Sequence, residues 1–218
     1  MPDLNFEVIG AEVPAFAAVP TLIFKLRVTN VDEQEHIHSV LLRSQVQITV
    51  NRRRYSPEEQ SQLLAIFGEP ERWGDTLRPL LWTHTNVTIP QFSGSVFVDM
   101  PIACSYDFEV VATKYFGAID DGEIPLTFLF SGTIFYAGIE ENLQVMQISW
   151  SKEAAYRFPI TLWQDMMAHY YPNSAYLRLR KDSFDRLYRY KATHGLPTWE
   201  SVIAQLLPPG EEEVNTCI

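Results

Sequence analysis

Apolar and polar residues alternate along most of the first 150 residues. In one run the even-numbered residues 22–28 are apolar, and Lys25 and Arg27 stand between them. A period of two is typical of antiparallel strands with one buried face. Similar runs span residues 4–9, 40–50, 81–89, 95–102, 126–136 and 143–150. Seven such runs, without helices of crossover length between them, predict an antiparallel β-sandwich, immunoglobulin-like or similar, in an α+β chain.

One helix is inserted among the predicted strands. Ser56 and Glu59 have the spacing of a capping box, in which each residue bonds the backbone of the other. The apolar positions after Glu59 continue as far as Phe67, and Gly68 follows them; glycine commonly ends a helix. The sequence therefore predicts a helix over about residues 56–67. A second segment, residues 109–119, fits either a short helix or a strand.

The period of the pattern changes after Pro159. Apolar residues then recur every three or four positions, which indicates a helix over about residues 162–170, a second that Asp182 caps and Gly195 closes, and a third over about residues 198–207 that Thr198 opens. About 60 residues alone make a marginal core, so we expect the helices to pack on the sandwich. The expected organisation is a sandwich over residues 1–157, a helical segment over residues 158–210, and an acidic disordered tail over residues 211–218.

Composition and charge exclude several classes of protein. With 46% hydrophobic and 13% aromatic residues, the chain has enough apolar surface to fold. The net charge of −10 argues against nucleic acid or an anionic membrane as a partner, because both attract basic surfaces. The first residues lack the basic region of a secretory signal, and no apolar run has the length of a spanning helix. Cys104 and Cys217 make a poor disulfide pair, so we expect a cytoplasmic protein with reduced thiols.

Two weak candidates emerge for metal binding and catalysis. His36 and His38 have strand spacing and would point the same way, but their polar segment offers no third soft ligand, and a loop entering a strand is favoured. Cys104 has no base in its own segment, and only His84 on another strand is a conceivable partner. An inert buried thiol is favoured. The chain has no zinc, calcium, phosphate-loop, dinucleotide or serine-hydrolase motif, so we expect no catalytic residue, no metal and no cofactor.

Aromatic residues around the inserted helix allow a ligand pocket. Trp82, His84 and Tyr106, together with Cys104, would line a pocket for a small molecule or carbohydrate if the fold brought them together. Core packing is the favoured role of most of these aromatic rings. Trp73 is the expected exception, because its neighbours in the sequence are charged, and we expect its side chain to be exposed.

Basic residues cluster at two places in this acidic chain. Arg52, Arg53 and Arg54 form one cluster, and residues 178–191 contain six of the 17 basic residues. Arg186 and Arg189 lie in the second cluster, on a predicted helix. Such clusters are most often solvated helix faces, but on an acidic chain they also suit an acidic partner surface. We therefore treat Arg52 to Arg54, Trp73, Arg186 and Arg189 as possible protein contacts.

Several stretches of the chain resemble an uncharacterised bacterial family known as a domain of unknown function. They include FGEPERWG, LRPLLWTH, PLTFLFSGTIFY and SFDRLYRYKATHGLPTWE, and the resemblance covers nearly the whole chain. The resemblance implies an accessory or assembly role, because genes of the family are reported in clusters with nickel–iron uptake hydrogenases. It implies no catalytic residue. A nickel or iron–sulfur carrier role has no support from cysteine pairs or histidine runs in this sequence.

Three functions remain open from the sequence, the third being a metal-handling chaperone that would use His36 and His38. The favoured hypothesis is a non-enzymatic accessory protein that binds another protein, with a hydrogenase-type complex as the partner that the resemblance implies. The alternative is a small-molecule or carbohydrate-binding sandwich that uses the pocket near Trp82, His84 and Tyr106. The oligomeric state does not follow from the sequence.

Overall fold

The computed structural model describes residues 1–105, 107, 110–138, 142–174 and 178–207. The chain divides into two compact units, residues 1–176 and residues 177–218. The expected boundary at residue 157 lies inside the first unit. Tyr106, Cys217 and the tail expected over residues 211–218 lie outside the described residues.

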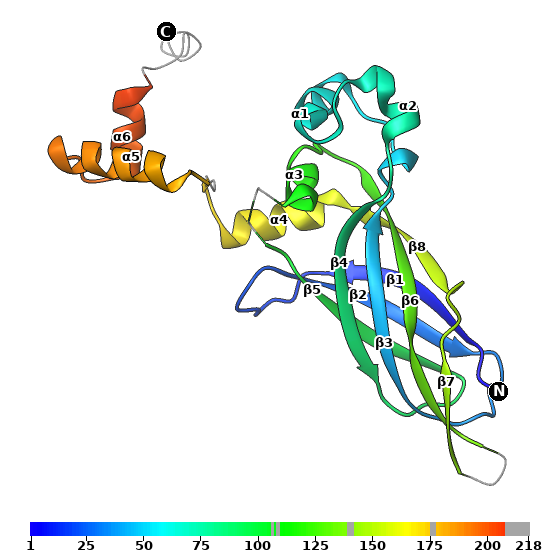
Figure 1. The fold of residues 1–218 in the computed structure, drawn as a ribbon. Helices are drawn as coiled ribbons and strands as arrows, with labels where there is room; N and C mark the ends of the chain where they lie inside the picture. Colours follow the sequence, from blue (N-terminus) through cyan, green and yellow to red (C-terminus); the bar gives the residue numbers. More distant parts are fainter. Residues whose placement is uncertain (106, 108–109, 139–141, 175–177, 208–218) are drawn as a thin grey trace. The chain divides into compact units, whose positions relative to one another are not determined.

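Within the described residues, eight strands form two antiparallel sheets, which are the two layers of a sandwich (Figure 1). Sheet A has the order β1–β2–β5, with bounds Leu4–Glu12, Thr21–Asn30 and Ser95–Ala103. Sheet B has the order β4–β3–β6–β7, with β8 also paired to β6. Its bounds are Ile37–Ile48 for β3, Leu80–Ile89 for β4, Glu123–Ala137 for β6, Leu143–Gln147 for β7 and Glu153–Pro159 for β8. The predicted α+β fold with an antiparallel sandwich is confirmed.

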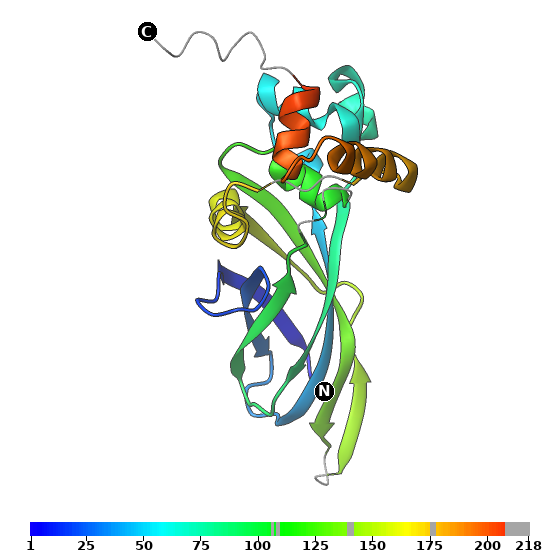
Figure 2. The same ribbon diagram turned by 90° about the vertical axis from the view of Figure 1, so that its left-hand side faces the viewer.

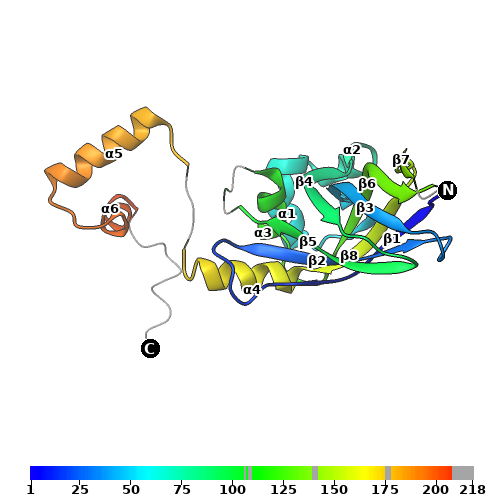
Figure 3. The same cartoon turned by 90° about the horizontal axis from the view of Figure 1, so that it is seen from below.

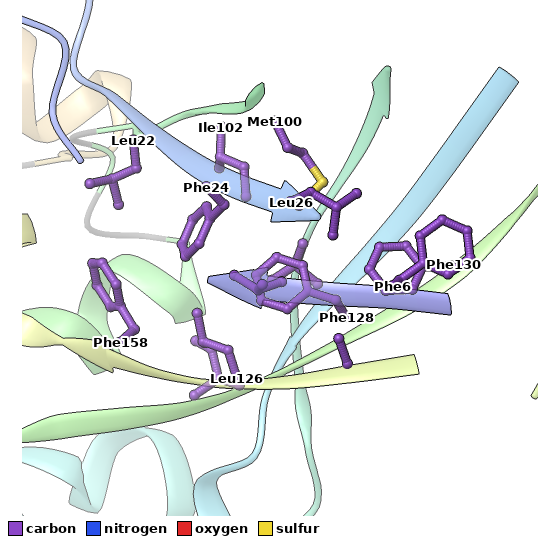
Figure 4. Packing of buried hydrophobic residues seen from close by; sticks show 14 of the residues in the cluster. Phe6, Leu22, Phe24, Leu26, Met100, Ile102, Leu126, Phe128, Phe130 and Phe158 are labelled. Atoms are coloured by element: carbon purple, nitrogen blue, oxygen red, sulfur yellow. The ribbon is translucent and has the colours of Figure 1, made fainter. Parts of the chain in front are cut away.

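The alternating pattern of the sequence accounts for the core between the sheets. Phe24 of β2 is fully buried, and its ring lies 5.2 Å from that of Phe128 and 5.7 Å from that of Phe158, both in sheet B. Phe6 of β1 stacks on Phe130 of β6 at 4.5 Å (Figure 4). Burying each such ring contributes about 1.5–3 kcal/mol, so the rows of alternate residues supply the main force that holds the sheets together.

Sheet B departs from the prediction at one edge. A single strand was expected over residues 143–150, but β7 ends at Gln147 and the unpredicted β8 begins at Glu153. Both strands pair with the same edge of β6, at its two ends. The backbone between them loops away from the sheet, which leaves the Trp150 side chain 92% exposed. The prediction of one strand over residues 143–150 is therefore wrong beyond Gln147.

Within the first unit, helices cover one end of the sandwich (Figure 2). The predicted inserted helix is confirmed as α1, Pro57–Phe67, with the complete Ser56 capping box. The one-turn helix α2 spans Trp73–Thr76, and α3 spans Val111–Gly117, which resolves the open segment in favour of a helix. The last of these helices, α4, spans Ile160–Tyr170 and runs directly on from β8 (Figure 3).

The helices of this end extend the core beyond the strands. Phe116 of α3 lies 4.9 Å from Trp82 of β4 and 5.6 Å from Trp163 of α4, measured between ring centroids. Phe116 and Trp163 are both buried. The aromatic ring of one short helix thus joins a strand of sheet B to the helix that follows the sheet.

The second unit contains two helices, α5 over Lys181–Thr193 and α6 over Trp199–Leu206. Thr198 caps α6 as the sequence predicts, by accepting a hydrogen bond from the Ser201 amide. The prediction that Asp182 caps α5 is wrong, because the N-cap is Arg180, two residues earlier, and Asp182 lies in the first turn of the helix. No helix in the described ranges is long and apolar enough to cross a membrane.

Gly132 marks the closest approach of two backbones in sheet B. It has a φ of +143°, and a Cβ atom at this position would lie 2.0 Å from the carbonyl oxygen of Leu41 on β3. Only glycine fits, because any side chain would collide with a backbone that cannot move without breaking the β3–β6 pairing.

We expect Gly132→Ala to lower the free energy of unfolding by about 1–3 kcal/mol or more, through backbone strain and loss of pairing. Chemical denaturation monitored by circular dichroism measures the change. Gly10→Ala is the matched control, because a Cβ at Gly10 meets nothing within 4 Å. Equal stability of the two variants would contradict this account of Gly132.

Candidate functional site

The three consecutive arginines that the sequence marks as a contact cluster have different environments. Arg53 points inward, with its side chain only 11% exposed, and forms two hydrogen bonds of 2.8 and 2.9 Å to the carboxylate of Glu59. It also donates to the carbonyl oxygen of Asp121 at 2.6 Å. Arg52 and Arg54 are exposed. Arg53 is therefore not available to a partner, and the expectation of a three-residue contact surface is corrected to two separate residues.

The carboxylate of Glu59 is almost fully enclosed, at 4% exposure. Burial by itself raises the pKa of Glu59, but the hydrogen bonds from Arg53 and from the backbone amides of Ser56 and Asp120 outweigh burial and hold the pKa below its ordinary value of 4.5. Each carboxylate oxygen thus accepts from both the guanidinium and a backbone amide. Both oxygens of the buried carboxylate therefore have hydrogen-bond donors, and its charge is balanced by Arg53.

Two tyrosines, Tyr55 before α1 and Tyr115 in α3, lie close to the Arg53–Glu59 pair. The Tyr55 hydroxyl donates to the carbonyl oxygen of Val50 at 2.7 Å, so the hydroxyl of Tyr115, 3.0 Å away, donates to Tyr55. Burial raises the pKa of Tyr55 to about 12 and raises that of Tyr115 as well. Both hydroxyls are therefore neutral near pH 7, and they act as hydrogen-bonding groups in the packing of α1 against α3.

Trp73 is not exposed, contrary to the prediction from its charged neighbours. The side chain is 8% exposed, and its ring packs edge-on against Tyr55 and Phe67, at 5.5 and 5.6 Å. Its indole nitrogen donates to the carbonyl oxygen of Gly68 at 2.9 Å. In one turn of helix a single residue faces inward while the others face solvent, which is why charged neighbours were misleading. Trp73 helps to fix α2 against α1.

A β-bulge separates two members of the expected ligand pocket. Val46 of β3 pairs with Thr83, and the next residue, Gln47, pairs with Leu81, so Trp82 is an extra residue in β4. One extra residue exchanges the two faces of a strand. Trp82 therefore packs into the core, whereas His84 lies exposed on the opposite face of the sheet.

Cys104 follows β5 and is buried. Its thiol lies 3.7 Å from the carbonyl oxygen of Ile102, and burial raises its pKa to about 12. A thiol with this pKa is almost entirely protonated near pH 7 and is a poor nucleophile. Since Tyr106 lies outside the described residues, the residues of the expected pocket give no converging set of reactive groups.

His36 and His38 lie near each other, as their spacing predicts. Their ring centroids are 5.0 Å apart, both residues are exposed, and His36 is 3.3 Å from the Ser93 hydroxyl. Across the described ranges, no three His, Cys, Asp or Glu side chains gather closely enough to hold a metal ion.

The second unit presents a groove between its two helices. The groove has a volume of about 430 Å³, and it is lined by Ser183, Arg186, Leu187 and Tyr190 of α5 and by Leu206 of α6. These α5 residues recur at three and four positions, which places them on one face of the helix. We call this groove together with the neighbouring Arg189 the α5–α6 surface.

An aromatic cluster on the adjacent side of α5 holds the two helices together. Trp199 of α6 lies 5.5 Å from Phe184 and 6.4 Å from Tyr188, between ring centroids. The ammonium group of Lys191 lies 5.8 Å from the Trp199 ring and donates to the carbonyl oxygen of Pro197 at 2.9 Å. The two helices are thus held together on one side of the groove by tilted aromatic rings and a cation.

The α5–α6 surface carries uncompensated positive charge. The two acidic residues of α5 are already in ion pairs, Asp182 with Arg180 and Asp185 with Lys181. Within the described part of the unit, Arg186 and Arg189 have no acidic partner, and both are exposed. The sequence identified these two arginines but missed Ser183, Tyr190 and Leu206. Only the pairing of α5 with α6, which no local spacing encodes, brings Leu206 beside Arg186.

Comparisons with known proteins find one family and several distant structural likenesses, of which two are described. A family model described as "Family of unknown function (DUF6084)" matches residues 1–215. No curated protein matches the chain. Among solved structures, a β-glucosidase from Kluyveromyces marxianus is 10% identical with a TM-score of 0.28, and the match covers 72% of this chain but only 15% of the β-glucosidase. A putative late embryogenesis abundant protein is 14% identical with a TM-score of 0.34, covering 73% of each chain. Neither likeness bears on function.

We expect Glu59→Gln to lower the free energy of unfolding by about 3–5 kcal/mol near pH 7, because the variant leaves Arg53 buried without its counter-charge. The native chain should also lose stability as the pH falls below 4.5, since the pKa of Glu59 is lower in the folded than in the unfolded state. The Gln variant should lack that part of the pH dependence. Denaturant unfolding at several pH values measures both effects.

Glu58→Gln is the matched control for this experiment. Glu58 is the neighbouring residue in the first turn of α1 and is exposed. Its loss should cost less than about 1 kcal/mol, the usual value of a charge at a helix start. If both variants lost stability equally, the Arg53–Glu59 pair would not have the role assigned to it.

Proposed function

We propose that this chain, which belongs to the DUF6084 family of unknown function, is a non-enzymatic accessory protein that binds an acidic segment of another protein through its α5–α6 surface. The observation that carries the proposal is the combination of an apolar groove with two unpaired arginines in a unit whose described residues include one buried side chain, Val202. A hydrogenase-type complex, implied by the family resemblance, is the first partner to test.

The two helices have too little core to be stable by themselves. They have 13 and 8 residues, and among their described residues only Val202 is buried. Isolated helices shorter than about 12–15 residues are marginal in water. Leu206 is 46% exposed and Tyr188 58% exposed, so binding a partner would remove apolar surface from water. This supports a surface that is completed by a partner.

Charge favours an acidic partner over other macromolecules. Residues 178–191 contain six basic and two acidic residues, although the whole chain has a net charge of −10. A local basic surface on an acidic protein attracts a local acidic segment, while the rest of the chain repels nucleic acid and anionic membranes. The groove gives such a segment a place for one apolar side chain between Leu187 and Leu206, beside the Arg186 guanidinium.

The alternative of a ligand pocket near Trp82 and His84 has less support, because the bulge in β4 directs the two side chains to opposite faces of sheet B. The protonated, buried Cys104 offers no nucleophile beside them. Protein binding therefore remains the better supported function.

We expect the double variant Arg186→Glu, Arg189→Glu to lose its protein partner. The full chain carrying an affinity tag is used to capture partners from cells, and mass spectrometry quantifies them against the native chain. Recovery of the specific partner should fall at least about tenfold, because two attractive contacts become repulsive. Binding of the native chain should also weaken with added salt.

The matched control reverses two exposed arginines of the first unit, Arg43→Glu with Arg72→Glu. Its net charge is the same as that of the test variant, so general electrostatic effects cancel. Circular dichroism verifies that α5 still forms. Unchanged capture by the Arg186, Arg189 variant would refute the proposal, as would equal loss in the control. A partner that proves to be nucleic acid or a second copy of this chain would also refute it.

The apolar part of the α5–α6 surface is tested separately. We expect Leu206→Gln to weaken binding of the identified partner by about five- to tenfold, because an apolar contact in the groove is lost. Ile203→Gln is the control, since Ile203 is similarly exposed at 50% but does not line the groove. Titration of purified partner into each variant measures the dissociation constants, and equal values would count against the groove.

A further inference from the structure

Besides the groove of the α5–α6 surface, the structure has a hollow on sheet B, whose residues lie far from α5 and α6 in the sequence. It has a volume of about 310 Å³ and lies where β3 ends and a 3-10 turn, Val50–Arg52, begins, at the end of the sheet nearest α1 (Figure 1). Its lining includes Thr49, Arg52, Thr127, Ala155, Tyr156 and Arg157.

The fold positions these groups from three separate segments. The backbone amide of Thr49 donates to the carbonyl oxygen of Pro125 at 2.8 Å, and the hydroxyls of Thr49 and Thr127 lie 2.9 Å apart. The amide of Arg52 donates to the carbonyl oxygen of Thr49 at 2.9 Å, which fixes the start of the Arg52 side chain beside the hydroxyl pair. Thr49 is buried, so the floor of the hollow is polar and rigid.

The strand register supplies the opposite wall. Thr127 of β6 pairs with Ala155 of β8, and Pro125 pairs with Arg157. Alternate residues share a face, so Arg157 and Ala155 lie on the same side of the sheet as Thr127. The small side chain of Ala155 leaves space that a larger residue would fill. The guanidinium of Arg157 therefore borders a hollow with hydroxyls at its base.

Positive charge in the hollow is not neutralised. Arg52 has no ion pair within the described ranges, whereas the next residue, Arg53, forms a buried ion pair with Glu59. Arg157 has only a loose contact of 3.8 Å to Glu123, and both side chains are more than half exposed, so the pair contributes little. The lining contains two cations and no acidic side chain.

We propose that this hollow binds the phosphate dianion of a small molecule. Two guanidinium groups offer parallel N–H donors that match phosphate oxygens. The hydroxyls of Thr49 and Thr127 bond each other, which uses one of their two hydrogens and leaves one donor at the base. The volume is at the lower limit of small-molecule sites, which suits a phosphate with a small organic group. Pro125, which pairs with Arg157 and therefore lies on the same face of the sheet, gives that group an apolar contact. The site is independent of the α5–α6 surface.

The test is a titration of the full chain with inorganic phosphate and with phenyl phosphate, followed by isothermal calorimetry and by NMR of the backbone amides. Acetate at matched ionic strength is the monoanionic reference. We expect saturable phosphate binding with shifts at Thr127 and Ala155, and acetate binding at least about tenfold weaker. Tighter binding of phenyl phosphate assigns the site to an ester, and equal binding assigns it to free phosphate.

Variants distinguish the site from general charge attraction. Arg52→Gln and Arg157→Gln should each weaken phosphate binding about tenfold or more, the usual effect of losing a charged hydrogen bond. Arg43→Gln is the matched control on the same face of sheet B and should change binding less than about twofold. Unfolding midpoints verify that each variant is folded. Equal weakening by the control, no preference over acetate, or shifts confined to residues 178–191 would overturn the proposal.

Discussion

The buried ion pair between Arg53 and Glu59 is the constraint on which the helical end of the molecule depends. It joins the segment after β3 to the first turn of α1, and through Asp120 and Asp121 it also holds the turn before β6. Gln164 of α4 donates to the same turn, at Ile119 and Asp120. Because a buried charge without its partner is costly, these segments must adopt one arrangement together.

Hydrophobic burial holds the two sheets together, whereas the Arg53–Glu59 pair positions the helices at their end. Rows of alternate apolar residues bring the two sheets together but do not specify how helices cover their end. The ion pair and the Tyr55–Tyr115 hydrogen bond position α1 and α3, and Phe116 then extends the aromatic core from Trp82 to Trp163. The rigid end that results also orients Thr49 and Arg52 at the hollow in sheet B.

Positive charge has three different roles in this acidic chain. Arg53 is buried and structural, Arg52 borders a hollow in the sandwich, and Arg186 lies exposed on a small helical unit. What separates them is the presence of a counter-charge within the fold. An arginine whose carboxylate is supplied by its own chain stabilises the structure, whereas an exposed arginine without one retains its capacity to bind an external anion.

The sequence by itself determined most of the strands and helices, because alternation and capping are local properties of the chain, but it left residues 109–119 open and missed β8. The capping box at Ser56 and the cap at Thr198 were read correctly, since their partners lie three residues away. Only the tertiary structure decided which side chains meet. The bulge that separates Trp82 from His84, the burial of Trp73 and the carboxylate opposite Arg53 all depend on strand register or helix packing, which sum many weak contacts between distant residues.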